Sequence, residues 1–142
     1  MKKAVIDTNV IVSAIQTGDS RSRDILRLVF LGQLIPLMSN ALFLEYEAVT
    51  QRPDVMCRCH FSAQEAEQFL DAVFASSQWV EIYFAWRPNL LDEGDNFLIE
   101  LAVAGNADYL ITNNIRDLKN GELLFPQLLI CSPQQFMAHW RS

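Results

Sequence analysis

The chain has 142 residues, of which 51% are hydrophobic, and this predicts one compact domain spanning residues 1–142. Its 17 acidic and 11 basic residues give a net charge of −6, which argues against a surface that binds nucleic acid through overall positive charge. The three cysteines are odd in number and lack the paired spacing of a structural zinc site, so they exclude a complete disulfide framework. We therefore expect reduced thiols and a cytoplasmic protein.

The pattern of apolar residues in the sequence predicts neither a membrane-spanning segment nor a secretion signal. No apolar run reaches the ~18 residues that span a bilayer, and the apolar stretch after the N-terminal lysines is broken by Asp7 and Asn9. Local basic groups do occur, at Arg21, Arg23 and Arg27 and again further along the chain. Such groups could contact phosphate or simply be solvated helix faces, and the sequence leaves both interpretations open.

Five short apolar runs alternate with segments of helical period, and this alternation predicts a parallel sheet wrapped by helices. The predicted strands are Lys3–Ile6, Leu34–Met38, Trp79–Tyr83, Ala107–Thr112 and Leu128–Cys131. Two helix starts fit the capping box, beginning at Ser62 and at Ser132, and the first predicts a helix over residues 62–77. The segment from Thr50 to Phe61 has no clear period and contains Pro53, which predicts a surface loop.

Acidic side chains stand where this fold would bring them together. Asp7 ends the first strand, and ligands of open parallel sheets bind beyond the carboxyl ends of the strands. Glu45 lies on a predicted helix with Leu42, Tyr46 and Val49 along one stripe, so it is expected on the core side. There it would either be held ionised by a cation or reach solvent as an ordinary helix-edge glutamate.

Further candidates follow in the second half of the chain. Asp92 and Asp95 precede an amphipathic helix, where Asp95 could equally serve as a cap. Asn114 and Asp117 come just after the strand that ends at Thr112, in a segment typical of turns. Each residue has a structural explanation of its own, but together these oxygen ligands predict a site for Mg²⁺ or Mn²⁺ that could activate water against a phosphodiester.

The chain at this point resembles the PIN domain family of metal-dependent nucleases, most closely the stand-alone bacterial members that act as toxins of toxin-antitoxin pairs. The resemblance spans nearly the whole chain and is carried by four segments: Val5–Val10, Ser39–Tyr46, Asp92–Ala102 and Ala107–Thr112. It implies a three-layer α/β/α fold with a central parallel sheet of about five strands.

The resemblance also implies residue roles. Asp7, Glu45 and Asp95 take the first three acidic positions of the family, as catalytic residues and metal ligands, with Asp92 as a helper. Where many relatives place an aspartate two residues after the threonine, this chain has Asn114, which could ligate through its carbonyl oxygen or be replaced by Asp117. Thr8, Asn9 and Thr112 would orient the carboxylates from behind.

The leading hypothesis is Mg²⁺- or Mn²⁺-dependent hydrolysis of single-stranded RNA by a toxin component. Its partners would be RNA, a cognate antitoxin and a second copy of the chain in a homodimer, with no membrane. The rival hypothesis is a catalytically weak PIN module that binds RNA or protein, because the neutral Asn114 replaces the usual fourth acid. A phosphatase that uses Asp7 as nucleophile fits less well, since Asn9 stands where its partner acid is expected.

Overall fold

The computed structural model describes residues 1–16, 20–59, 61–82, 96–118 and 125–141. Its centre is a five-stranded sheet in the order β3-β2-β1-β4-β5, in which every strand pairing is parallel. The strands are β1 (Lys2–Ile6), β2 (Leu34–Met38), β3 (Gln78–Trp79), β4 (Tyr109–Ile111) and β5 (Leu129–Cys131). This arrangement confirms the predicted parallel sheet.

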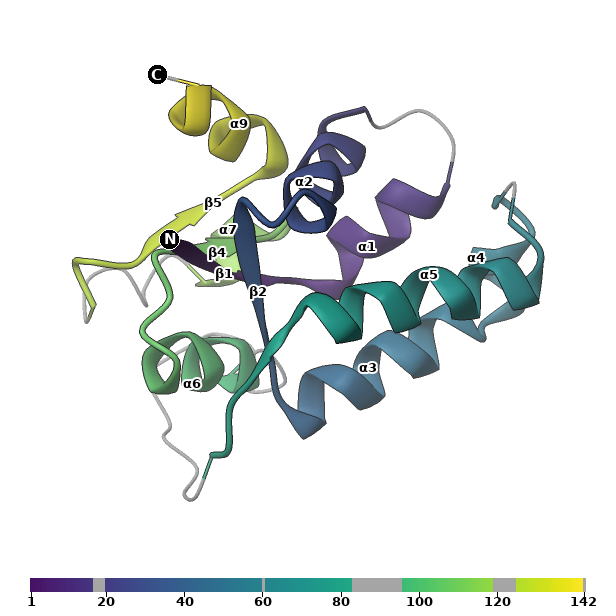
Figure 1. The fold of residues 1–142 in the computed structure, drawn as a ribbon, viewed down its shortest axis with the longest axis horizontal. Coiled ribbons are helices and arrows are strands. Elements are labelled where there is room, and N and C mark those ends of the chain that lie inside the picture. Colours follow the sequence, from purple (N-terminus) through teal and green to yellow (C-terminus); the bar gives the residue numbers. More distant parts are fainter. Residues whose placement is uncertain (17–19, 60, 83–95, 119–124, 142) are drawn as a thin grey trace.

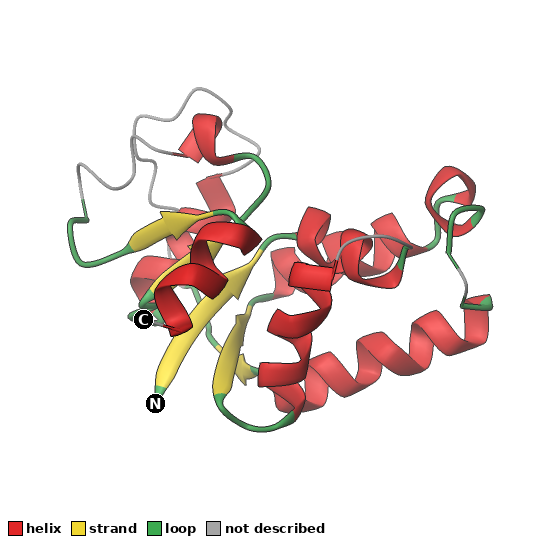
Figure 2. Ribbon diagram, turned by 90° about the horizontal axis from the view of Figure 1, so that it is seen from above, coloured by secondary structure: helices red, strands yellow, loops and turns green. Residues whose placement is uncertain are grey.

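Helices connect the strands, as parallel pairing requires. They are α1 (Thr8–Ile15), α2 (Ser20–Phe30), α3 (Asn40–Thr50), α4 (Pro53–Met56), α5 (Ala63–Ser76), α6 (Asn96–Ala104), α7 (Ile115–Leu118) and α9 (Pro133–Arg141). Figure 1 shows α2 and α9 on one side of the sheet and α6 on the other, which gives the three layers expected from the sequence. Figure 1 also shows α3 and α5 side by side at one end of the molecule, and Figure 2 shows the molecule from above.

The core lies between the sheet and its helices. The inner strands are almost fully buried, with Val5 and Leu110 at 0% exposure on adjacent strands, because both faces of a parallel sheet are covered. Three apolar residues on one face of the amphipathic helix α6, Leu98, Leu101 and Ala102, are all buried. Within the described ranges, no helix is both long enough and apolar enough to cross a membrane.

The strand predictions were right in number and order and differed at the ends. β4 is confined to Tyr109–Ile111, because the turn that ends α6 lies at residues 105 and 106 and residues 107 and 108 only lead into the strand. The predicted strand Trp79–Tyr83 is paired only at Gln78–Trp79, since β2 offers it a partner only at Leu37 and Met38. Tyr83 itself lies outside the described residues.

Both capping boxes are confirmed. The Ser62 hydroxyl accepts the Glu65 N–H at 3.1 Å while the Glu65 carboxylate accepts the Ser62 N–H at 2.9 Å, and α5 begins at the next residue. Ser132 and Gln135 make the same pair of bonds before α9, at 3.1 and 3.0 Å. These helix starts could be predicted because a cap is a contact between residues three apart in the chain.

The predicted loop between Thr50 and Phe61 was wrong in part, because it contains the one-turn helix α4. Pro53 is its first residue, where the missing N–H costs no hydrogen bond and the fixed φ favours a helix start. Arg52 is extended, as a residue before proline should be, and serves as the N-cap.

Candidate metal centre

The strand order creates a topological switch point at the carboxyl ends of the neighbouring strands β1 and β4. From β1 the chain runs outward to β2 on one side, and β4 pairs with β1 on the other. In such sheets ligands bind at the carboxyl ends of the two strands where the order reverses. Asp7 directly follows β1 and Thr112 directly follows β4, so both flank this point, and the Asp7 N–H bonds the Ile111 carbonyl at 2.9 Å.

The Asp7 carboxylate is the centre of a hydrogen-bond network there. Asp7 is 8% exposed, and its Oδ2 accepts the Thr112 hydroxyl at 2.7 Å and the Asn9 amide at 3.2 Å. Its Oδ1 accepts the Thr8 hydroxyl at 3.3 Å. A carboxylate offers about four acceptor positions, so this arrangement saturates Oδ2 and leaves Oδ1 able to take one more ligand.

The loop after β4 fixes which way these donors point. The Asn113 N–H donates to Asn9 Oδ1 at 3.1 Å, which turns the Asn9 amide nitrogen toward Asp7. The Asn114 N–H donates to the Thr112 hydroxyl oxygen at 2.9 Å, which leaves the single Thr112 proton for Asp7. The backbone of one loop therefore orients two of the three donors that hold the carboxylate, as supporting groups of metal ligands do.

Tyr46 connects α3 to the same point. Its side chain is 1% exposed, and its hydroxyl donates a hydrogen bond to the Ile6 carbonyl, immediately before Asp7. Burial raises the pKa of Tyr46 well above its usual value, and the negative charge of Asp7 raises the pKa further. The phenol is therefore a neutral donor that ties α3 to the end of β1.

Glu45 is exposed, and the prediction that it lies on the core side of its helix was wrong. The buried stripe of α3 runs through Leu42, Tyr46 and Thr50, at intervals of four residues. Successive helix residues are about 100° apart, so the inward direction of Tyr46 turns Glu45 toward solvent. Tyr46 thus links α3 to the residue before Asp7, while the neighbouring Glu45 side chain is exposed to solvent.

Of the other predicted ligands, the structure describes some and not others. Asn114 is exposed in the loop after Thr112, beside the Asp7 network. Asp117 lies on α7, and the position of its side chain is outside the described part of the structure. Asp92 and Asp95 lie outside the described residues altogether. The described part therefore brings together Asp7, Thr8, Asn9, Thr112 and Asn114.

The chemistry of this donor set fits a hard divalent cation. Asp7 forms no ion pair with the lysines and arginines of the described ranges, so a nearly buried carboxylate is held by neutral donors alone. Carboxylate oxygens such as those of Asp7 are ligands that Mg²⁺ and Mn²⁺ prefer. The described residues include no cluster of three acidic, histidine or cysteine side chains that could bind a metal by themselves. A complete site needs acids from elsewhere in the chain.

Sequence reasoning missed two parts of this site. Tyr46 was recognised only as a member of the Glu45 motif, although its position next to a candidate ligand was a usable indication. Asn113 directly follows Thr112 and was therefore expected at the same edge of the sheet as Asp7, but no sequence pattern indicated that its N–H orients Asn9, 104 positions away. Both depend on contacts between segments that are distant in the chain.

Comparison with known proteins supports this fold. The structure is similar to VapBC2 from Rickettsia felis, solved bound to a DNA fragment from their promoter, at 17% identity over 92% of this chain and 98% of that chain, with a TM-score of 0.62. It is also similar to FitAcB from Neisseria gonorrhoeae, at 14% identity over 92% of this chain and 98% of that chain, with a TM-score of 0.60.

No curated protein sequence matches the chain significantly. A family model described as PIN domain matches residues 3–116, a span that includes Asp7, Glu45, Thr112 and Asn114. That span also contains β2, β4, all of β1 except Lys2, and the loop that orients the Asp7 carboxylate. The chain therefore belongs to the PIN domain family.

Proposed function

We propose that this protein is an endoribonuclease that uses Mg²⁺ or Mn²⁺ to hydrolyse single-stranded RNA. PIN domains are generally nucleases, which supports the reaction class. The observation that carries the proposal is the Asp7 carboxylate, nearly buried at the switch point and held by Thr8, Asn9 and Thr112 with one acceptor position open. A carboxylate fixed in this way is prepared to hold a cation in one geometry.

Asp7, Glu45 and Asp95 are the proposed ligands, with Asp92, Asn114 and Asp117 as further proposed contributors. A divalent ion in such a site lowers the pKa of bound water and neutralises charge that develops on phosphate. The protein's own part is to orient Asp7, through donors whose directions are fixed by the backbone of Asn113 and Asn114. In this proposal the exposed side chain of Glu45 turns from α3 toward the site.

The test is cleavage of labelled single-stranded RNA by the purified protein, with and without Mn²⁺, beside Asp7→Asn. This substitution removes the charge at nearly constant size, so it should abolish cleavage while circular dichroism remains that of the native protein. Asp54→Asn is the matched control, because Asp54 is exposed and bonded only locally to Arg52, and it should cleave normally. Full activity in Asp7→Asn would refute the assignment.

A second candidate function is supported by Asn114. A neutral amide binds a divalent cation more weakly than a carboxylate does, so the chain could act as a PIN module that binds RNA or protein without efficient cleavage. Calorimetric titration with Mn²⁺ separates the two functions. Binding that is lost in Asp7→Asn supports the nuclease, whereas no binding to the intact protein at millimolar Mn²⁺ supports the second function.

We further propose that the protein is the cytoplasmic toxin of a toxin-antitoxin pair, with a cognate antitoxin as partner and a homodimer as its assembly. The likeness of the fold to VapBC2 and FitAcB supports this role. Induced expression in bacterial cells should arrest growth, and Asp7→Asn should not. Arrest by both forms would show that growth inhibition does not depend on the site.

A further inference from the structure

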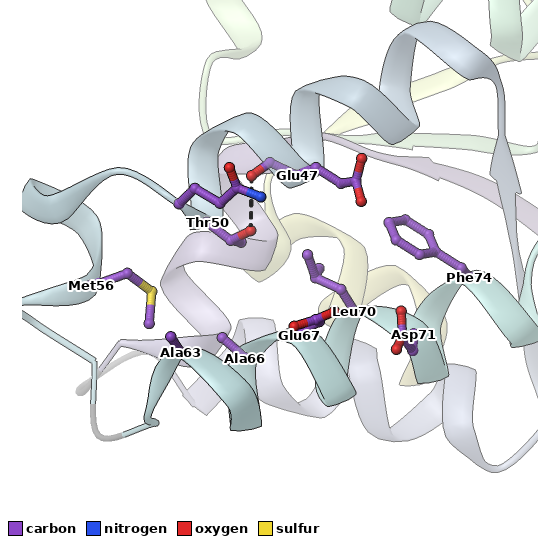
Figure 3. A pocket seen from close by; sticks show the side chains of 10 residues that line it. Glu47, Thr50, Met56, Ala63, Ala66, Glu67, Leu70, Asp71 and Phe74 are labelled. Carbon is purple, nitrogen blue, oxygen red and sulfur yellow. Dashed lines mark hydrogen bonds between the residues drawn. The ribbon is translucent and has the colours of Figure 1, made fainter.

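A groove separate from the Asp7 site lies between α3 and α5. It has a volume of about 310 Å³ and is drawn in Figure 3. Its floor is apolar and is made by Met56, Ala66, Leu70 and Phe74, of which Ala66 and Leu70 are buried in the pair of helices. A cavity of this size accepts one or two large side chains and is too small for a whole helix.

Three carboxylates, Glu47, Glu67 and Asp71, line the same groove. Glu67 and Asp71 are exposed on α5, and Glu47 extends from α3 on the opposite side, as Figure 3 shows. The carboxylate groups of all three form no ion pair and no hydrogen bond with another residue in the described ranges. They are therefore available to a partner.

The placement of these charges is unfavourable for the isolated protein. Glu67 and Asp71 are four residues apart on one helix, where like charges repel and destabilise the helix. Glu47 adds a third negative charge from the facing helix. Repulsion of this kind is relieved when a cation enters the groove.

The combination of an apolar floor and an acidic rim selects one kind of side chain. Arginine and lysine lay an aliphatic stem along apolar surface and carry a charge at the end, so the stem fits over Leu70 and Met56 while the head reaches the carboxylates. The Phe74 ring offers a further favourable surface for the cation. A second copy of this chain would itself bring a net charge of −6, which disfavours it as the occupant.

We propose that the α3–α5 groove docks a basic segment of a partner protein, which inserts an arginine or lysine side chain flanked by apolar residues. The groove is lined by α3 residues other than the buried Tyr46 that joins the Asp7 network. Docking therefore does not depend on whether the protein cleaves RNA, and the two proposals can fail separately.

The probe is a short fluorescein-labelled amphipathic peptide of leucine, alanine and arginine, and its binding to the full chain is measured by fluorescence anisotropy. The double variant Glu67→Gln with Asp71→Asn should bind it about tenfold more weakly, since charge-assisted hydrogen bonds are lost. The matched control is Asp24→Asn with Asp54→Asn, which changes the net charge equally outside the groove and should bind within about twofold of the native protein. Both double variants should cleave RNA as the native protein does.

Two further arms separate docking from diffuse attraction. Ala63→Leu fills the exposed end of the groove without removing charge and should also weaken binding. A peptide with serine in place of leucine keeps its arginines and should bind poorly. Equal binding of the serine peptide, or equal loss in the control double variant, would overturn the proposal. The double variant Glu67→Gln with Asp71→Asn should fold normally, because removing the repulsion between these two residues leaves α5 at least as stable.

Discussion

Replacement of Thr112 by valine tests how strongly the Asp7 network contributes to the fold. Thr112 is 0% exposed, and valine has nearly the same shape, so Thr112→Val removes a hydroxyl without opening a cavity. The substitution deletes the 2.7 Å bond to the Asp7 carboxylate, worth about 1.5–3 kcal/mol, and the 2.9 Å bond from the Asn114 N–H, worth about 0.5–1.5 kcal/mol. We expect the free energy of unfolding to fall by about 2–4.5 kcal/mol.

Urea denaturation followed by circular dichroism measures this loss. Thr50→Val is the matched control, because Thr50 is also buried, at 8% exposure, and its hydroxyl donates only to helix carbonyls, at 2.9 Å to Tyr46. Its loss should cost under about 1 kcal/mol. In an Asp7→Asn background, Thr112→Val should cost less than in the native protein, since the charged acceptor is gone. A loss no larger than that of Thr50→Val would refute the network as described.

Three further predictions concern neighbouring features. The pKa of Tyr46 is raised in the folded state, so its contribution to the free energy of unfolding is complete below pH ~10 and is lost as the pH rises toward that higher pKa. Tyr46→Phe should therefore reduce the fall in stability at alkaline pH. Denaturation at a series of pH values measures this, and an unchanged alkaline slope would contradict it. Asn114→Asp should tighten Mn²⁺ binding in calorimetry, because a carboxylate is the better ligand, and unchanged affinity would remove Asn114 from the site. Gly105→Ala should lower the free energy of unfolding by about 1–3 kcal/mol, since an added Cβ would stand 2.6 Å from Leu37 Cδ1. An unchanged free energy in thermal denaturation would show that Leu37 moves aside.

The sequence by itself determined the features that depend on near neighbours. The strands were recognisable as short apolar runs, and the capping boxes at Ser62 and Ser132 as polar pairs three residues apart. Residues 105 and 106 are glycine and asparagine, the types that commonly end a helix, and Asn106 adopts the left-handed conformation directly after α6, with φ 55°. The position of Asp7 at the edge of the sheet also followed, because a strand end and a parallel sheet together fix an edge.

Only the tertiary structure decided which polar groups act on Asp7 and which helix faces are buried. The same periodicity allowed Glu45 to face inward, but the bond from Tyr46 to the Ile6 carbonyl fixes the rotation of α3 and leaves Glu45 in solvent. The orientation of Asn9 is set by the Asn113 N–H, which approaches from 104 positions away. Such contacts depend on how whole elements pack, and a local pattern of residue types does not encode the rotation of one element against another.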